Sequence, residues 1–183
     1  MNTAANVEPM TRAELEAHWM PYSGNRQFKD DPRMIMAADG VWYTDDKGRQ
    51  VLDGHSGLWT TGLGHGRREI TEAVHQQLRT LDFAPPFQFG HPKAFQLANK
   101  VKALMPGDLD YVFFTNSGSE SADTSLKMAR AYWRLKGQPS KTRFIGRAKG
   151  YHGVNFGGIS VGGIAANRKH FGQGVDSVPL RHT

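Results

Sequence analysis

One stretch decides the fold of this chain: Tyr111-Val112-Phe113-Phe114-Thr115-Asn116-Ser117-Gly118-Ser119-Glu120. An apolar run ends there at a small polar turn and a helical pattern begins at once, which predicts a strand over residues 111–115 followed directly by a helix. Ser117 and Glu120 have the spacing of a capping box, and Gly118 and Ser119 leave the first helical amides accessible. Because the positive end of a helix dipole attracts anions, we expect an anion-binding turn here.

A second feature lies beyond the next candidate strand, residues 142–146. There Tyr151 sits in a glycine-flanked loop, Lys149-Gly150-Tyr151-His152-Gly153. A helical crossover between strands 111–115 and 142–146 predicts that the two strands are parallel. An anion-binding turn followed by an exposed aromatic ring suits a flat, phosphorylated cofactor, and the sequence thus indicates an α/β protein with such a site.

These residues resemble a known family. The stretch Phe113 to Arg130, followed by Tyr151-His152-Gly153, closely resembles the class III (omega) aminotransferases, which are pyridoxal 5′-phosphate enzymes of fold type I. The stretches 18–22, 25–28 and 53–59 look like those of the omega-amino acid:pyruvate (β-alanine:pyruvate) branch. The resemblance covers roughly residues 12–183, and an ordered series of matches is far more specific than one motif.

The resemblance implies both an activity and a site. The family moves an amino group from an omega-amino acid or amine to pyruvate, using pyridoxal 5′-phosphate and acting as a homodimer or larger homo-oligomer. Carried over residue by residue, the expected cofactor-binding residues are Ser117, Gly118, Ser119, Tyr151 and His152. The expected substrate-binding residues are Tyr22, Trp59, Tyr151 and Phe87, the last contributed across the dimer interface.

The chain departs from the family at one point. The lysine that binds the cofactor as a Schiff base, and the aspartate paired with its pyridine nitrogen, have no counterpart in residues 1–183. Lys127, Lys141 and Lys149 lie near the site, but none matches the family's catalytic position. We therefore expect an amino-terminal portion of such an enzyme, with the first part of its large mixed or parallel-sheet domain, no catalytic residue of its own and no activity alone.

Charge is unevenly distributed along the chain. Residues 126–183 hold 11 basic side chains and one acidic one, whereas residues 1–125 hold 12 basic and 16 acidic ones. Such asymmetry indicates either an acidic partner or further acidic sequence that covers the basic segment. There are no cysteines, and no apolar run or secretion signal that would suggest a membrane protein or an exported one. A cytoplasmic protein without a membrane partner is expected.

Local patterns suggest two regions. Residues 1–66 are expected to form a short helix over 11–19 and an antiparallel meander from strands 34–36, 41–43 and 50–52, separated by turn residues. Residues 67–183 are expected to begin the large cofactor-binding α/β domain, with helices over 67–81 and 91–104 before the strand and helix described above. The glycine-rich residues 54–66 form the loop between the two regions.

Three other interpretations compete. The glycines of residues 62–67 match part of a dinucleotide fingerprint, but Arg67 takes the place of the third glycine. Ser160 stands in a G-x-S-x-G pattern followed by Asp176 and His182, the order of a serine hydrolase. Without cysteine or an H-x-x-x-H spacing, no metal site is expected. The basic helix face of Lys127, Arg130, Arg134 and Lys136 leaves open a module that binds nucleic acid or another polyanion.

Overall fold

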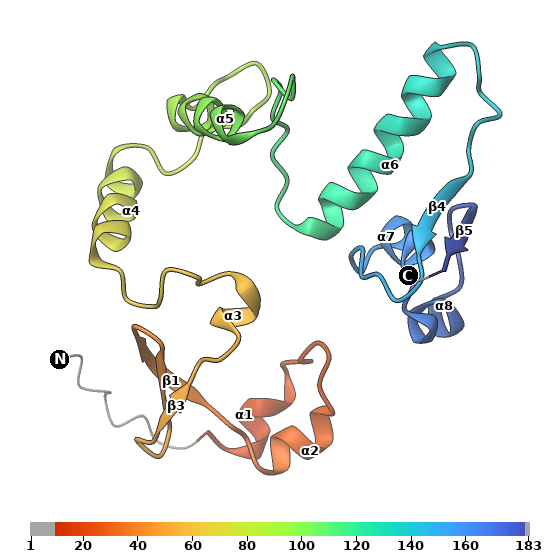
Figure 1. Cartoon of the computed structure of the whole chain (residues 1–183). Helices are drawn as coiled ribbons and strands as arrows, with labels where there is room; N and C mark the ends of the chain where they lie inside the picture. The colour runs from red at the N-terminus through yellow and green to blue at the C-terminus, as the bar shows by residue number, and fades with distance from the viewer. Residues whose placement is uncertain (1–9, 182–183) are drawn as a thin grey trace. The chain divides into compact units, whose positions relative to one another are not determined.

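The computed structural model describes residues 10–181, and the chain divides into two compact units, residues 1–91 and 92–183 (Figure 1). This division falls later in the chain than the sequence-based boundary at residue 66, which stays a prediction about the family's domains. The first unit contains α1 (Arg12–Glu16), α2 (Asn25–Asp30), β1 (Ile35–Asp39), β2 (Trp42–Asp45), β3 (Gln50–Leu52), α3 (Ser56–Trp59) and α4 (Arg68–Thr80). The second contains α5 (Pro92–Leu104), α6 (Gly118–Leu135), β4 (Phe144–Arg147), α7 (Phe156–Val161), α8 (Ala165–Phe171) and β5 (Ser177–Leu180).

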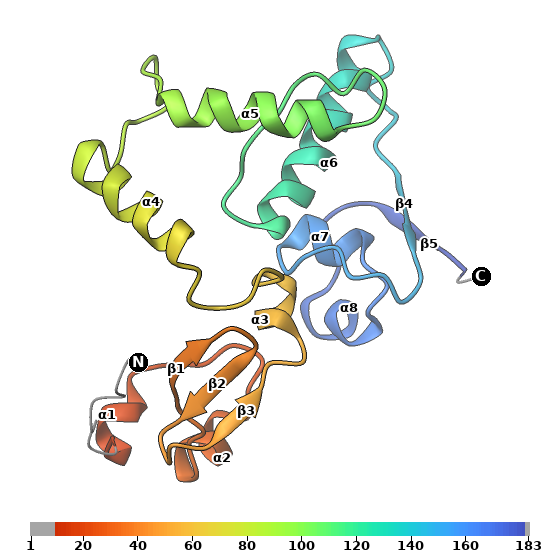
Figure 2. The ribbon, with the colours of Figure 1, turned by 60° about the vertical axis from the view of Figure 1, so that its left-hand side comes forward.

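The first unit is built on the predicted antiparallel meander. Strands β1, β2 and β3 lie side by side in that order (Figure 2), with a bulge between Ile35 and Ala37. Asp45 closes the turn between β2 and β3, because its buried carboxylate accepts hydrogen bonds from the backbone of Lys47 (3.0 Å) and of Arg49 (2.7 Å). Local turn chemistry therefore fixes the meander, as the sequence predicts.

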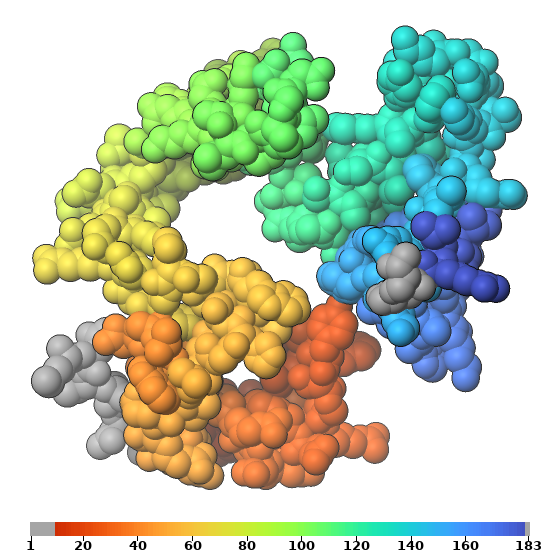
Figure 3. All heavy atoms as spheres, in the orientation of Figure 1, coloured from red at the N-terminus to blue at the C-terminus, as the bar shows by residue number. Residues whose placement is uncertain are grey.

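Helix α1 begins with the predicted capping box between Thr11 and Glu14. The helix ends at Glu16, before the predicted end at residue 19, and α2 is an element that the sequence pattern does not reveal. Helices α4 and α5 match the predicted ranges. Neither packs on another helix or strand among residues 10–181, and Figure 3 shows α4, in yellow, open to solvent on the face drawn. Along the part of the chain that the structure describes, no helix has the length and apolarity needed to cross a membrane.

The second unit is centred on α7, which contacts α6, α8 and both strands of the parallel pair β4 and β5. Its residues from Gly157 to Val161 are buried. Gly146 of β4 allows this packing, because a Cβ atom added there would lie 1.7 Å from the carbonyl oxygen of Val161. Only glycine permits such a close approach of two backbones.

The predicted strand over residues 111–115 is wrong: these residues form no strand. The partner predicted for the strand over 142–146 is wrong as well, since β4 pairs in parallel with β5, matching Phe144 to Ser177 and Arg147 to Leu180. A strand exists only where its backbone groups join a ladder with another segment. No segment among residues 10–181 supplies that ladder for residues 111–115.

Candidate functional site

The first turn of α6 has the predicted cap. Ser117 has extended backbone angles and its Oγ accepts a hydrogen bond from the Glu120 amide at 3.1 Å. The second half of the predicted capping box is displaced by one residue, because the Glu120 carboxylate accepts from the Asn116 amide at 2.7 Å instead of from Ser117. Among the described residues, the backbone amides of Gly118 and Ser119 have no hydrogen-bond partner, and a Cβ added at Gly118 would meet nothing within 4 Å. Both donors are free, and the space over Gly118 is open.

The Tyr151 loop is seated on this turn. The Val154 amide donates to Ser119 Oγ at 3.0 Å. Gly153 has φ of +101°, and a Cβ added there would lie 2.8 Å from Ser119 Cα. A side chain at this position would both strain the backbone and push the loop off the helix. The structure thus brings the predicted residues Ser117, Gly118 and Ser119 together with the loop that carries Tyr151 and His152.

Asp123, one turn further along α6, secures the next segment. Its Oδ1 accepts a hydrogen bond from the Gly158 amide at 2.9 Å, and a Cβ at Gly157 would lie 2.5 Å from the same oxygen. Asp123 therefore holds the start of α7 against α6 and, with it, the far end of the Tyr151 loop. Sequence reasoning missed this residue, since a carboxylate within a helix carries no local signal of a partner 35 positions away.

A hollow of about 410 Å³ lies beside this turn, lined by residues from Phe113 to Asn116, by Glu120, Asp123, Thr124 and Lys127 of α6, and by Asn155. Gly118 and Ser119 are not part of its lining. The hollow therefore lies along the segment before α6, and the free amides of Gly118 and Ser119 do not open into it.

The predicted substrate-binding aromatics are exposed. Tyr22, Trp59 and Phe87 belong to the first unit and are 87%, 84% and 82% exposed, and Tyr151 of the second unit is 62% exposed. Side chains of this size are normally covered in a stable protein. None of the four is a core residue of the unit that carries it.

Backbone strain is concentrated at these four aromatics. Among residues 10–181, the non-glycine residues with positive φ are Tyr22, Ser56, Leu58, Trp59, Gln88 and Lys149. Each of them is one of the four aromatics or lies within three positions of one. Residues with a Cβ rarely occupy the left-handed region, and such outliers cluster where a structure holds functional groups in place. Backbone geometry therefore singles out the same four segments that the family resemblance indicates, although it is independent of that resemblance.

The Trp59 segment is fixed by a partly buried pair that the sequence did not single out for a role. Asp53 Oδ2 lies 2.8 Å from His65 Nε2, and Asp53 Oδ1 accepts from the Gly57 amide at 3.1 Å. The hydrogen bond to His65 is the largest cause of an Asp53 pKa lowered to about 2. The carboxylate stays charged and ties both ends of the loop together.

Two competing motifs have structural explanations. Ser160 of the G-x-S-x-G pattern is fully buried, and its Oγ accepts from the amides of Gly174 (2.9 Å) and Val175 (3.1 Å). It cannot act as a nucleophile. Asp176 pairs with Arg143 at 2.9 Å, and His182 lies outside the described residues.

The glycine-rich residues 62–67 do not have the structural setting of a dinucleotide-binding turn. The His65 amide donates to the Gly40 carbonyl at 2.7 Å, and a Cβ at Gly64 would lie 3.0 Å from the Gly40 oxygen. This loop packs on the turn between β1 and β2, and no parallel strand leads into it. Its glycines therefore serve close backbone packing.

A capped helix with free amides, carrying an aromatic loop on its first turn, thus stands within residues 117–154. The family model for Aminotransferase class-III matches residues 24–181, which include this whole site. The chain belongs to the class-III aminotransferases. Sequence and structure relatives agree, and each is longer than this chain.

The chain is 64% identical to the beta-alanine–pyruvate aminotransferase of Pseudomonas aeruginosa, covering 100% of this chain and 41% of that protein. It is 61% identical to the omega-amino acid–pyruvate aminotransferase of Pseudomonas putida, over 98% of this chain and 40% of the relative. It therefore spans about two fifths of the length of these curated relatives.

Solved structures give the same family. An (S)-enantioselective omega-transaminase from Thermomicrobium roseum superimposes with a TM-score of 0.88 and 37% identity, over 96% of this chain and 41% of that one. The omega transaminase of Pseudomonas jessenii in complex with PMP superimposes with a TM-score of 0.87 and 31% identity, over 94% of this chain and 39% of that one. The fold-type-I assignment made from the sequence is confirmed.

The residues present fit the phosphate of a class-III cofactor. Two unpaired backbone amides at the positive end of an 18-residue helix are suitable donors to phosphate oxygens. The Ser117 hydroxyl accepts from Glu120 and still has its own hydrogen to donate. The open space over Gly118 leaves room for the ligand.

Proposed function

We propose that this chain is part of an aminotransferase that moves an amino group from an omega-amino acid or amine to pyruvate with pyridoxal 5′-phosphate. The observation that carries the proposal is the seating of the Tyr151 loop on the first turn of α6, where Gly153 contacts Ser119. An aromatic residue thus lies in a loop that is hydrogen-bonded to the Ser119 side chain, next to two free helix amides. The identities of 64% and 61% to two pyruvate-dependent aminotransferases favour this donor and acceptor class.

In this proposal the amides of Gly118 and Ser119, with the Ser117 hydroxyl, donate hydrogen bonds to the phosphate. Tyr151 stacks on the pyridine ring, and His152 lies beside it in the same loop. The cofactor supplies the electron-withdrawing ring on which amino transfer depends. The chain's own contribution is to bind and orient that ring, and we assign no catalytic lysine within residues 1–183.

In this proposal the substrate-binding residues are Tyr22, Trp59, Tyr151 and Phe87. Aromatic faces accept the methylene chain of a donor whose amine is remote from its carboxylate, and they exclude water around it. The role of Phe87 across a dimer interface, the homo-oligomer itself and a cytoplasmic location stay predictions. The polyanion-binding alternative gains no support, because the chain matches the aminotransferase family over residues 24–181.

Cofactor binding is tested by titrating pyridoxal 5′-phosphate into the protein as its gene encodes it. Gly118→Asp places a carboxylate at the phosphate site, and like-charge repulsion should weaken binding by at least about tenfold. Gly62→Asp is a matched control, because a Cβ at Gly62 also meets nothing within 4 Å. Tyr151→Ala should weaken binding through lost stacking. Equal affinities for all four proteins would place the cofactor elsewhere.

The reaction is tested by measuring alanine formed from pyruvate and β-alanine in the loaded protein. We expect turnover that depends on both substrates. Absence of turnover with β-alanine and with a panel of terminal amines would refute the proposed function.

A further inference from the structure

Tyr22 is held in an unusual conformation. Its φ is +53°, in the left-handed region that residues with a Cβ seldom occupy, and its side chain is 87% exposed. Solvent contact offers no packing that would offset this strain. A nearby residue of the same chain must therefore stabilise the turn, and the structure identifies it as Asn25.

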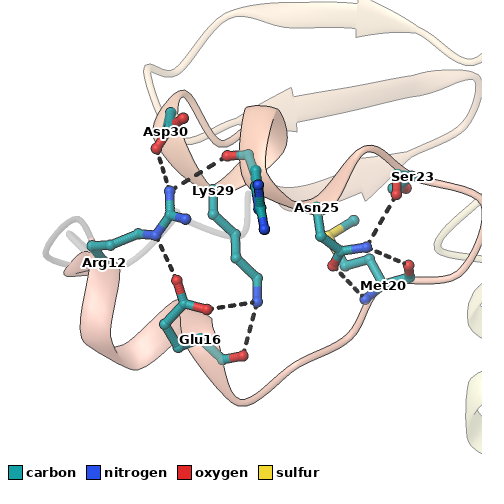
Figure 4. Close-up of polar contacts among 8 residues, drawn as sticks. Arg12, Glu16, Met20, Ser23, Asn25, Lys29 and Asp30 are labelled. Carbon is teal, nitrogen blue, oxygen red and sulfur yellow. Dashed lines mark hydrogen bonds and ion pairs between the residues drawn. The ribbon is translucent and has the colours of Figure 1, made fainter.

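The Asn25 carboxamide clamps the turn that contains Tyr22 (Figure 4). Its Oδ1 accepts from the Met20 amide at 2.8 Å, and its Nδ2 donates to the Met20 carbonyl at 2.9 Å and to the Ser23 carbonyl at 3.0 Å. Asn25 thus bonds both backbone groups of the residue two positions before Tyr22 and the carbonyl just after it. The ends of the Tyr22 turn are joined through one side chain.

The clamp requires asparagine. The Met20 amide needs an acceptor and the two carbonyls need donors, so the amide oxygen and the amide nitrogen have fixed places. An aspartate of the same size keeps the acceptor but turns a carboxylate oxygen toward two carbonyl oxygens. Met20 and Asn25 are both partly buried, which limits replacement of these bonds by water.

The base of the clamp is braced on both flanking helices. Lys29 of α2 is buried, and its Nζ donates to the Glu16 carbonyl at the end of α1 at 2.8 Å. Arg12 bonds Glu16 within α1 and reaches Asp30 at the end of α2 (Figure 4). These contacts hold α1 and α2 together, so both ends of the connecting segment, residues 17–24, are fixed. Asn25 then determines the conformation of the turn within that segment.

We propose that Asn25 is a positioning residue for Tyr22, fixing the backbone from which this aromatic side chain faces the amino donor. The inference rests on the proposed function for the role of Tyr22, whereas the clamp itself rests on the three hydrogen bonds. Asn25 does not act on the substrate directly. Its effect on donor selection passes through the conformation of residues 20–23.

The clamp is tested by amide hydrogen exchange in the protein as its gene encodes it, comparing the natural protein with Asn25→Asp and Asn99→Asp. Asn99 is an exposed residue within α5, and it serves as a matched control for the same change. Because the carboxylate would repel the Met20 and Ser23 carbonyl oxygens and open the turn, exchange at the Met20 amide should accelerate by about tenfold in Asn25→Asp and stay unchanged in Asn99→Asp. Unaltered exchange in a folded Asn25→Asp protein would overturn the proposal.

Action through Tyr22 is tested by a double-mutant cycle on kcat/KM for β-alanine. Asn25→Asp should lower it by about tenfold, mainly by raising KM, and should have little further effect when Tyr22 is already alanine. Equal losses with and without Tyr22 would show that Asn25 acts by another route and overturn the positioning role. If the natural protein forms no alanine at all, the proposed function fails, and hydrogen exchange alone decides the clamp.

Discussion

His65 Nε2 lies 2.8 Å from Asp53 Oδ2, and this contact closes the loop that carries Trp59. The Asp53 and His65 side chains are only 6% and 16% exposed. The His65 ring also packs on the Tyr43 ring of β2, with centroids 4.7 Å apart. Within the closed loop, Ser56, Leu58 and Trp59 all have positive φ, between +48° and +67°. The partly buried pair therefore stabilises a strained turn that carries an exposed aromatic residue.

This pair should make stability depend on pH. The pKa of Asp53 is lowered from 3.8 to about 2, first by the hydrogen bond with His65. A lowered folded-state pKa means that the stabilisation is complete above the unfolded pKa and is lost as pH falls through the folded one. Asp53→Asn should therefore be less stable than the natural protein at pH 5, and the difference should shrink between about pH 4 and pH 2. Urea unfolding across this range measures it, and a constant difference would contradict the role of the Asp53 charge.

Gly153→Ala should detach the Tyr151 loop from α6. The new Cβ would lie 2.8 Å from Ser119 Cα, on a backbone with φ of +101°. We expect cofactor affinity to fall at least about tenfold, since the loop and the amides no longer share one geometry. Gly172→Ala separates backbone strain from the steric clash, because φ at Gly172 is +76° but a Cβ there meets nothing within 4 Å. That control should lose some thermal stability and keep its affinity for pyridoxal 5′-phosphate, and equal affinity losses in both variants would refute the contact.

Ser160→Ala should destabilise the second unit without removing a catalytic group. The change leaves the amides of Gly174 and Val175 without their acceptor, and each lost hydrogen bond should cost about 0.5–1.5 kcal/mol. Ser125→Ala is the control, since Ser125 is exposed and its hydroxyl donates a hydrogen bond to the Ser121 carbonyl of its own helix. Chemical unfolding compares the two. Covalent labelling of Ser160 by a serine-directed phosphonate would contradict its structural role.

The isolated polypeptide of residues 1–183 should expose much apolar surface. On α4 alone, Ile70, Val74 and Leu78 are 51%, 52% and 58% exposed and lie along one face. Burial of each such side chain is worth roughly 1.5–3 kcal/mol, and the basic segment 126–183 adds repulsion. We expect hydrophobic-dye binding, aggregation and no aminotransferase activity. A soluble monomer with one cooperative thermal transition and no dye binding would disprove this expectation.

The amino-acid sequence by itself determined the features that depend on residues within one or two turns of each other. The Ser117 cap, the Thr11 capping box, the meander turns and the ranges of α4 and α5 all follow from interactions across a few positions. The same is true of the free amides at Gly118 and Ser119, since a helix terminus leaves them unpaired wherever the helix begins. A long series of matched residues then indicated the family.

Tertiary structure alone decided the features that join distant segments. Three such contacts join residues whose proximity no local sequence pattern predicts. They are the pairing of Phe144 with Ser177, the hydrogen bond from the Gly174 amide to Ser160, and the contact of Gly153 with Ser119. Residues 111–115 have the composition of a strand, yet composition supplies no ladder partner. The clamp at Asn25 and the pair Asp53 and His65 likewise depend on where folding brings a donor to an acceptor. Propensity acts along the chain, whereas hydrogen-bond geometry and close packing act through space.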